Sequence, residues 1–145
     1  MAEDTVKKPE DEAKKEREKK AVEARLAQSP IASKGSVKTA KDAQLDYLAT
    51  CEYLPVVKHA FGNERGEPEA AIFATAYELE NATAAARPVC FAFNGGPGSS
   101  SVWLHLGALG PKRVVVPDDS SMPTPPYAVS DNPLTWLAHF DLVFI

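Results

Sequence analysis

Residues 93–101, FNGGPGSSS, place three glycines and a proline between an apolar run and an amphipathic one. Glycine lacks a Cβ, so another molecule can approach its main chain closely. The peptide N–H groups at the start of a helix are unpaired and carry partial positive charge. A strand, a glycine-rich turn and a helix start in this order therefore form a device for holding negative charge.

Three uses of this loop compete. A tight turn alone ordinarily needs one glycine, not three plus a proline. Dinucleotide binding is the second, because residues 96–101 approximate GxGxxG and Asp118 lies about twenty residues further on. Against it, Ser101 stands at the third glycine position and Pro97 removes a donor. No GKS or GKT follows, which argues against a P-loop.

The third use is an oxyanion hole, in which peptide N–H groups stabilise the negative oxygen that forms when a carbonyl is attacked. One such donor can lower the barrier by about 3 kcal/mol. Hydrolases of the α/β class take one donor from a glycine-rich loop after an early strand and another from the residue after the nucleophile. The position of residues 93–101, early in a strand-rich chain, agrees with this use.

The elements before the loop read as strands. Residues 53–59 and 69–79 are rich in β-branched, aromatic and alternating apolar positions, and turn formers at 62–66 separate them, so an antiparallel hairpin is expected. Residues 88–93, PVCFAF, are apolar at consecutive positions. Such a run is typical of a strand inside a sheet, covered on both faces.

After the loop, residues 101–109 predict a short helix, capped at its start by Ser99 or Ser100 and ended by Gly110 and Pro111. Residues 112–116 predict a further strand. The proline-rich residues 117–133 read as a loop that closes on an Asn-Pro turn, and FDLVFI at the end of the chain again has a buried-strand pattern.

Residues 1–25 consist mainly of lysine, glutamate and alanine with nearly balanced charge. Such a segment buries too little apolar surface to order itself, although opposite charges at helical spacing favour a transient solvated helix. Residues 28–41 continue as a linker rich in serine, glycine and proline. We therefore expect a disordered charged tail and linker over residues 1–44 and a folded part over residues 45–145.

Composition excludes several classes of function. The chain has 145 residues and a net charge of −4, so it lacks the basic surplus that nucleic acid attracts. Cys51 and Cys90 lie far apart with no metal-ligand spacing, and they indicate neither a metal site nor a disulfide framework. The charged amino end is not followed by an apolar segment, and no run of about eighteen apolar residues occurs. We expect no nucleic acid partner, no membrane span and, without a signal peptide, a cytoplasmic location.

Two motifs in order, FAFNGGPGSSSVWLHLGALGPKRV and NPLTW followed by FDLVFI, resemble the serine carboxypeptidases, a branch of the α/β-hydrolase fold. The resemblance covers roughly residues 53–145. It implies an α/β fold that forms the N-terminal portion of a hydrolase mixed sheet, in which an antiparallel hairpin leads into parallel strands.

The resemblance also implies site residues. Gly96 would donate its N–H to the oxyanion, and Asn94 with the Gly95 N–H would bind the free C-terminal carboxylate of a peptide or protein substrate. An amide side chain beside bare backbone donors can hydrogen-bond a carboxylate, and no cofactor is implied. Two positions depart from the family pattern: Ser99 stands where cysteine is common, and Ala108 where glutamate is common.

A catalytic serine on a GxSxG-like elbow is absent from the sequence, as are the later acid and histidine. The three serines of the loop read as helix-capping residues, and His59, His105 and His139 as surface or packing residues. We therefore expect a fragment that is inactive alone, with exposed strand faces and a sheet edge that make it unstable or prone to aggregate. A Rossmann-like unit or a non-catalytic interaction protein on a hydrolase scaffold are the alternatives; the oligomeric state stays open.

Overall fold

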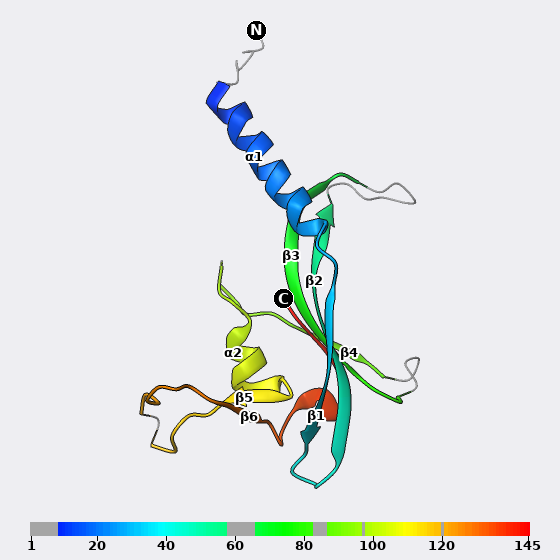
Figure 1. Ribbon diagram of the computed structural model, residues 1–145, viewed down its shortest axis with the longest axis vertical. Coiled ribbons are helices and arrows are strands. Elements are labelled where there is room, and N and C mark those ends of the chain that lie inside the picture. The colour runs from blue at the N-terminus through cyan, green and yellow to red at the C-terminus, as the bar shows by residue number, and fades with distance from the viewer. Residues whose placement is uncertain (1–8, 58–65, 83–86, 97, 120) are drawn as a thin grey trace. The chain divides into compact units, whose positions relative to one another are not determined.

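The computed structural model describes residues 9–57, 66–82, 87–96, 98–119 and 121–145 (Figure 1). The chain divides into two compact units. The first comprises Met1–Ser29 and Glu52–Phe73, and the second comprises Pro30–Cys51 and Ala74–Ile145.

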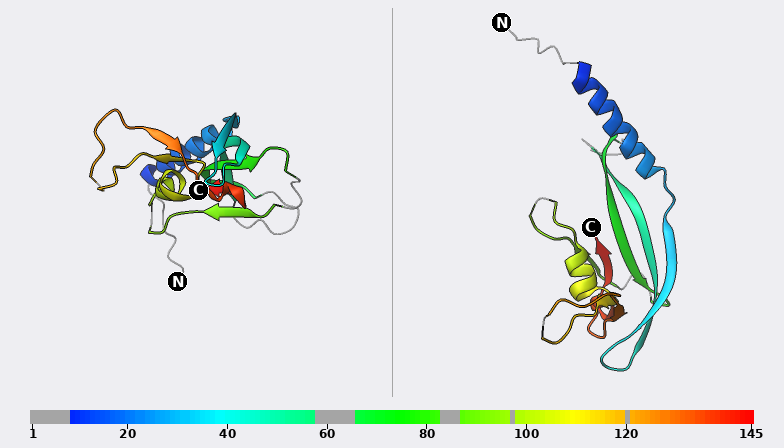
Figure 2. Two further views of the ribbon diagram at one scale, coloured as in Figure 1. Left: turned by 90° about the horizontal axis from the view of Figure 1, so that it is seen from below. Right: turned by 60° about the vertical axis from the view of Figure 1, so that its left-hand side comes forward.

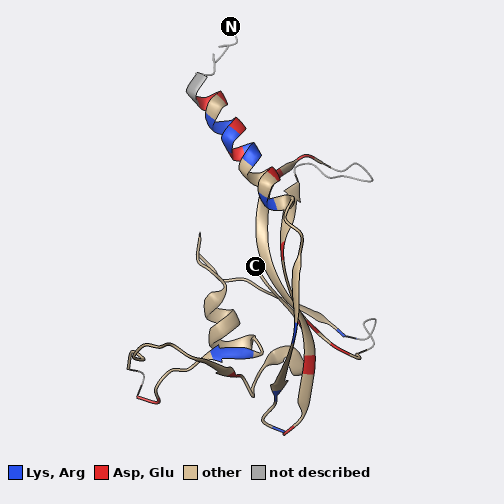
Figure 3. Cartoon of the chain, in the orientation of Figure 1, with Lys and Arg blue, Asp and Glu red and all other residues tan. Residues whose placement is uncertain are grey.

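In the first unit, helix α1 spans Pro9–Leu26 and its described side chains are almost all exposed. Positive and negative residues alternate along it (Figure 3), and ion pairs join Lys20 to Glu16 at 3.4 Å and Lys14 to Glu18 at 4.0 Å. Where the sequence led us to expect a disordered tail, these residues are helical, because alanine, lysine and glutamate are strong helix formers that i,i+4 pairs support. Residues 1–8 lie outside the described part.

A five-stranded sheet has the order β1-β2-β3-β7-β4. Its strands span Ile31–Lys38 (β1), Gln44–Val57 (β2), Pro68–Leu79 (β3), Asp141–Phe144 (β7) and Val89–Ala92 (β4). Strand β7 runs antiparallel to β3 and parallel to β4. The Glu80 N–H donates to the Asp46 carbonyl at 2.8 Å and so joins the end of β3 to the start of β2, as an antiparallel hairpin requires. The predicted α/β class with a mixed sheet is confirmed; the turn predicted at 62–66 lies largely outside the described residues.

Strand β1 corrects the linker expected over residues 28–41. It pairs antiparallel with β2 from Ile31↔Cys51 to Lys38↔Gln44, so pairing in the sheet begins before residue 45. The sequence of β1 lacks the alternating apolar pattern of a strand, because Val37 is its one buried residue. At Gly35 a Cβ would lie 2.6 Å from the Tyr47 ring, so the glycine in this strand admits an aromatic side chain from the neighbouring one.

Strand β4 forms where predicted, but it is the outermost strand of the sheet and not an inner one. Its Ala92 side chain is buried in the core. On the opposite face Val89 and Phe91 are 51% and 61% exposed. The expectation that both faces of this strand are covered is therefore wrong within the described chain.

Strand β5 (Lys112–Val114) pairs antiparallel with β6 (Val129–Asp131) in a separate two-stranded sheet. Sequence reasoning had placed β6 inside the loop over 117–133, because three residues with one exposed valine carry too short a pattern to indicate a strand. Lys112 Nζ donates both to Asp131 across this ribbon and to the Ser36 carbonyl of β1 at 3.2 Å. The ribbon is thereby tied to the larger sheet.

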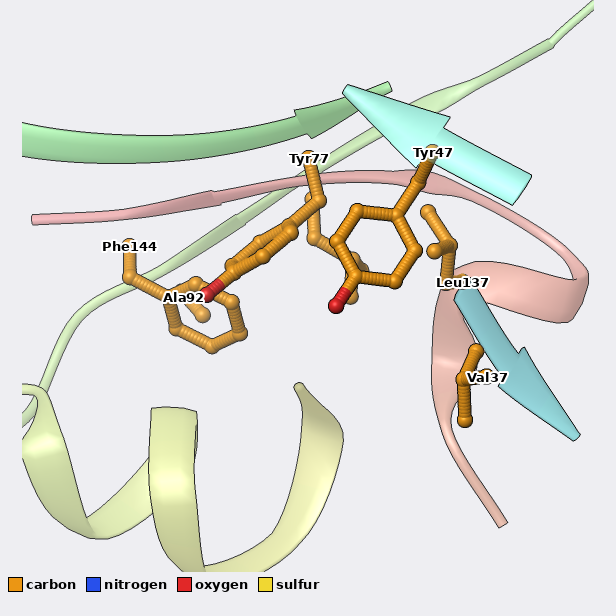
Figure 4. Packing of buried hydrophobic residues seen from close by; sticks show 7 residues of the cluster. Val37, Tyr47, Tyr77, Ala92, Leu137 and Phe144 are labelled. Atoms are coloured by element: carbon orange, nitrogen blue, oxygen red, sulfur yellow. The ribbon is translucent and has the colours of Figure 1, made fainter. Parts of the chain in front are cut away.

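The core of the second unit lies on one face of the sheet (Figure 4). Its buried side chains are Val37, Tyr47, Tyr77, Ala92, Leu137, Leu142 and Phe144. Over this face lies a helix made of α2 (Val102–Leu104) and a π-helical turn, η2 (His105–Leu109) (Figure 2). A single 3₁₀ turn, η3 (Trp136–Ala138), supplies Leu137. Among the described helices, none has the length and apolar character needed to cross a bilayer.

Candidate functional site

The glycine loop joins the end of β4 to the start of α2. Gly96 and Gly98 have φ values of 78° and 80°, a backbone conformation that favours glycine. Gly95 has neither this conformation nor a close neighbour, since a Cβ there would meet nothing within 4 Å. Its lack of a side chain keeps the peptide surface bare toward solvent. Pro97, which removes a donor from the loop, lies outside the described residues.

Asn94 holds the loop together. Its Nδ2 donates to Ser99 Oγ at 2.9 Å and to the Ser100 carbonyl at 3.4 Å, and its Oδ1 accepts from the Gly95 N–H at 3.2 Å. The two residues expected to bind a carboxylate are therefore neighbours, but they bond to each other. A carboxylate that takes the Gly95 N–H must displace the Asn94 oxygen.

Gly96 has the kind of backbone N–H donor that an oxyanion hole requires. Its carbonyl accepts from the Ser99 N–H at 3.2 Å, which closes the turn. Its own N–H has no acceptor within the described part of the chain, and the residue is exposed. An unpaired N–H can donate to a ligand oxygen without breaking a hydrogen bond within the protein.

The hydroxyls of the three serines in the loop form hydrogen bonds within the protein. Ser100 Oγ accepts from the Val102 N–H at 3.3 Å, and Ser99 Oγ accepts from Asn94 Nδ2. The N-cap of the helix is Ser101, whose side chain forms no capping bond, so the prediction of Ser99 or Ser100 as the cap is wrong. The buried Ser101 hydroxyl donates to the Ile145 carbonyl. No histidine contacts any of these hydroxyls in the described ranges.

His105 is a packing residue, as expected. Its Nε2 lies 2.6 Å from the Tyr77 hydroxyl, and its ring stacks on Phe144 with centroids 4.4 Å apart. Burial lowers the pKa of His105 and raises the pKa of Tyr77 to about 12. His139 is exposed beside Phe140, and His59 lies outside the described residues.

The two sequence motifs meet in space at the end of the helix. Asn132 of NPLTW is 2% exposed, and its Nδ2 donates to the Ala108 carbonyl at 2.7 Å and to the Gly110 carbonyl at 2.8 Å. Thr135 Oγ1 donates to the Leu109 carbonyl at 2.9 Å. These donors take up carbonyls that the end of a helix leaves unpaired. We call this group of bonds the carbonyl clamp; sequence reasoning read Asn132 only as a turn residue.

The two tryptophans differ in exposure. Trp136 is 45% exposed and lies beside Phe140 with ring centroids 5.9 Å apart. Trp103 is 72% exposed. Ala108, at the position where the family pattern has glutamate, uses its carbonyl in the carbonyl clamp.

The dinucleotide reading needs the strand after the loop to return to the same sheet. Strand β5 instead pairs with β6 in the separate ribbon, and Asp118 is an exposed turn residue beyond its end. The geometry therefore disfavours a nucleotide site at this loop.

A hollow of about 430 Å³ is lined by none of the residues of the glycine loop. It is lined by the β1–β2 turn and by the segment around η3, and its polar side chains include Lys41 and His139. The described residues contain no group of three or more His, Cys, Asp or Glu side chains that could hold a metal ion.

Comparison with models of protein families, with curated proteins and with solved structures found no match to this chain. The likeness to the serine carboxypeptidases rests on its two motifs alone.

Proposed function

We propose that this chain supplies the oxyanion-hole and substrate-carboxylate loop of a serine-type carboxypeptidase, whose Ser/Asp/His triad lies outside these 145 residues. Gly96 donates its N–H to the oxyanion of the acyl-transfer intermediate. Asn94 and the Gly95 N–H bind the terminal carboxylate of the peptide substrate. On this proposal the chain alone binds but does not hydrolyse.

The observation that carries the proposal is the exposed Gly96 N–H, which has no acceptor among the described residues, in a loop held together by the hydrogen bonds of Asn94 and Ser99. The bare Gly95 peptide adds to it, because nothing in the described chain requires glycine there. Both features make sense when another molecule approaches the main chain from outside.

Binding of a terminal carboxylate tests the proposal. A short peptide with a free C-terminus and the same peptide with a C-terminal amide are titrated separately into the isotopically labelled chain, and the Gly95 and Gly96 amide resonances are followed by NMR. We expect the free acid to shift both resonances and the amide to leave them unchanged. Equal responses, or no response, contradict the proposal.

Gly95→Ala is the most specific variant for this test, because the new Cβ has open space and residue 95 has an ordinary backbone conformation. It should leave the melting temperature unchanged and weaken binding of the free acid. Asp118→Ala, in an exposed turn away from the loop, serves as the matched control and should bind like the wild type. Binding that survives Gly95→Ala unchanged places the carboxylate elsewhere.

A further inference from the structure

Strand β4 leaves one edge of the sheet open. The carbonyls of Pro88 and Ala92 accept from the Asp141 N–H at 3.0 Å and the Ile145 N–H at 3.1 Å, so these residues direct their peptide groups toward β7. Successive residues of a strand direct theirs to alternate sides. The peptide groups of Val89 and Phe91 therefore face away from β7, where no strand pairs with them in the described chain.

The side chains along this edge are apolar and uncharged. Val89, Phe91 and Phe93 alternate with the buried-face residues, and they are 51%, 61% and 67% exposed. The strand and its flanks, PVCFAF, contain no charged residue. An edge with open peptide groups and an apolar stripe is a template for pairing with another strand.

The opposite edge is protected. Strand β1 carries Lys34 and Lys38, and Lys34 Nζ lies 2.6 Å from a Glu80 carboxylate oxygen. Charged side chains of this kind discourage edge-to-edge pairing. The two edges of the sheet thus differ in charge: β1 carries charged side chains that discourage pairing, and β4 carries none.

We propose that β4 pairs antiparallel with β4 of a second copy of this chain, about a two-fold axis at Phe91. In this register Phe91 faces Phe91 of the second copy, and Val89 faces its Phe93. The strand opposes its own copy without a charge on either side, and it forms aromatic and aliphatic cross-strand pairs. Because the contact is the same patch on both copies, association closes at a dimer. The inference concerns the 145 residues by themselves, because under the proposed function the remaining strands of the hydrolase sheet would compete with the second copy for this edge.

Sedimentation velocity over a wide range of concentrations tests the dimer. We expect a monomer–dimer equilibrium in the wild type. Phe91→Lys places like charges at the axis and should raise the dissociation constant by more than about tenfold. Trp103→Lys makes the same change at a residue that is 72% exposed outside the sheet, and it should leave the dissociation constant unchanged. Far-UV circular dichroism checks that both variants keep the fold.

Disulfide trapping tests the register. In a background with Cys51→Ser and Cys90→Ser, Phe91→Cys should give a covalent dimer on mild oxidation, because Cα atoms of a hydrogen-bonded antiparallel pair lie about 5.5 Å apart, within disulfide reach. Trp103→Cys in the same background should not. A monomer at all concentrations, growth beyond the dimer, or equal trapping at both positions overturns the proposal. A monomer would leave the edge to a strand from a different protein.

Discussion

Removal of the Asn132 side chain tests the carbonyl clamp most directly. Asn132→Ala deletes two donated bonds and one accepted from the Leu134 N–H at 3.2 Å. The Gly110 carbonyl is buried and would lose its partner without replacement, at a cost of about 1–3 kcal/mol. The Ala108 carbonyl and the Leu134 N–H are less buried and would lose about 0.5–1.5 kcal/mol each. We expect the free energy of unfolding to fall by roughly 2–6 kcal/mol.

Urea unfolding, followed by circular dichroism with the slope of the transition compared between variants, measures this change. Ser130→Ala, a polar truncation in neighbouring β6, is the control and should stay within about 0.5 kcal/mol of the wild type. Asn132→Asp keeps the shape and the acceptor but removes both donors. Its deficit against the wild type should shrink in acid, where the new carboxyl gains a proton to donate. A loss below about 1 kcal/mol for Asn132→Ala would refute the assigned role of the clamp.

Two further predictions concern the packing around the core. Gly35→Ala should lower the free energy of unfolding in urea by about 1–3 kcal/mol, because the new Cβ would lie 2.6 Å from the Tyr47 ring. Gly107→Ala is the control and should not destabilise the chain, because its new Cβ has open space. Equal losses of stability in the two variants would contradict the close packing of Tyr47 on Gly35. Burial lowers the pKa of His105 below its ordinary 6.5, so the unfolded chain takes up a proton first as pH falls and stability is lost below that value. The decline in melting temperature between pH 7 and pH 5 should be smaller in His105→Phe, and an unchanged decline would show that His105 does not titrate in this way.

Strands β3, β4 and β7 and the helix after the loop could be read from the sequence, whereas β2 was read only in part, because it begins at Gln44 and not at residue 53. Their apolar periodicity and flanking turn residues are local properties, and local patterns specify where elements form. The surroundings of a strand are not local. An apolar run such as residues 88–93 predicts burial on both faces, but the burial of β4 depends on which strands pair beside it. Strand β1 was missed for the converse reason, since pairing through the backbone needs few apolar side chains.

In the glycine loop, too, local features could be predicted from the sequence and non-local contacts could not. Its glycines and its place between strand and helix were visible in the sequence, whereas the bond between Asn94 Oδ1 and the Gly95 N–H was not. The carbonyl clamp joins residues more than twenty positions apart. The unpaired carbonyls at the end of any helix were the available signal, because they require donors from somewhere.

The π-helical turn η2 makes the fold sensitive to the number of residues in this part of the chain. The Gly110 N–H donates to the His105 carbonyl five residues earlier, so this turn holds one residue more than an α-helical turn would. Deleting one residue here would let the helix tighten, and its end would swing by about 100° relative to its start. The His105 ring and the Ala108 carbonyl could then no longer face the sheet and Asn132 together. The number of residues in this turn of the first motif is thus under geometric control, independent of which amino acids fill it.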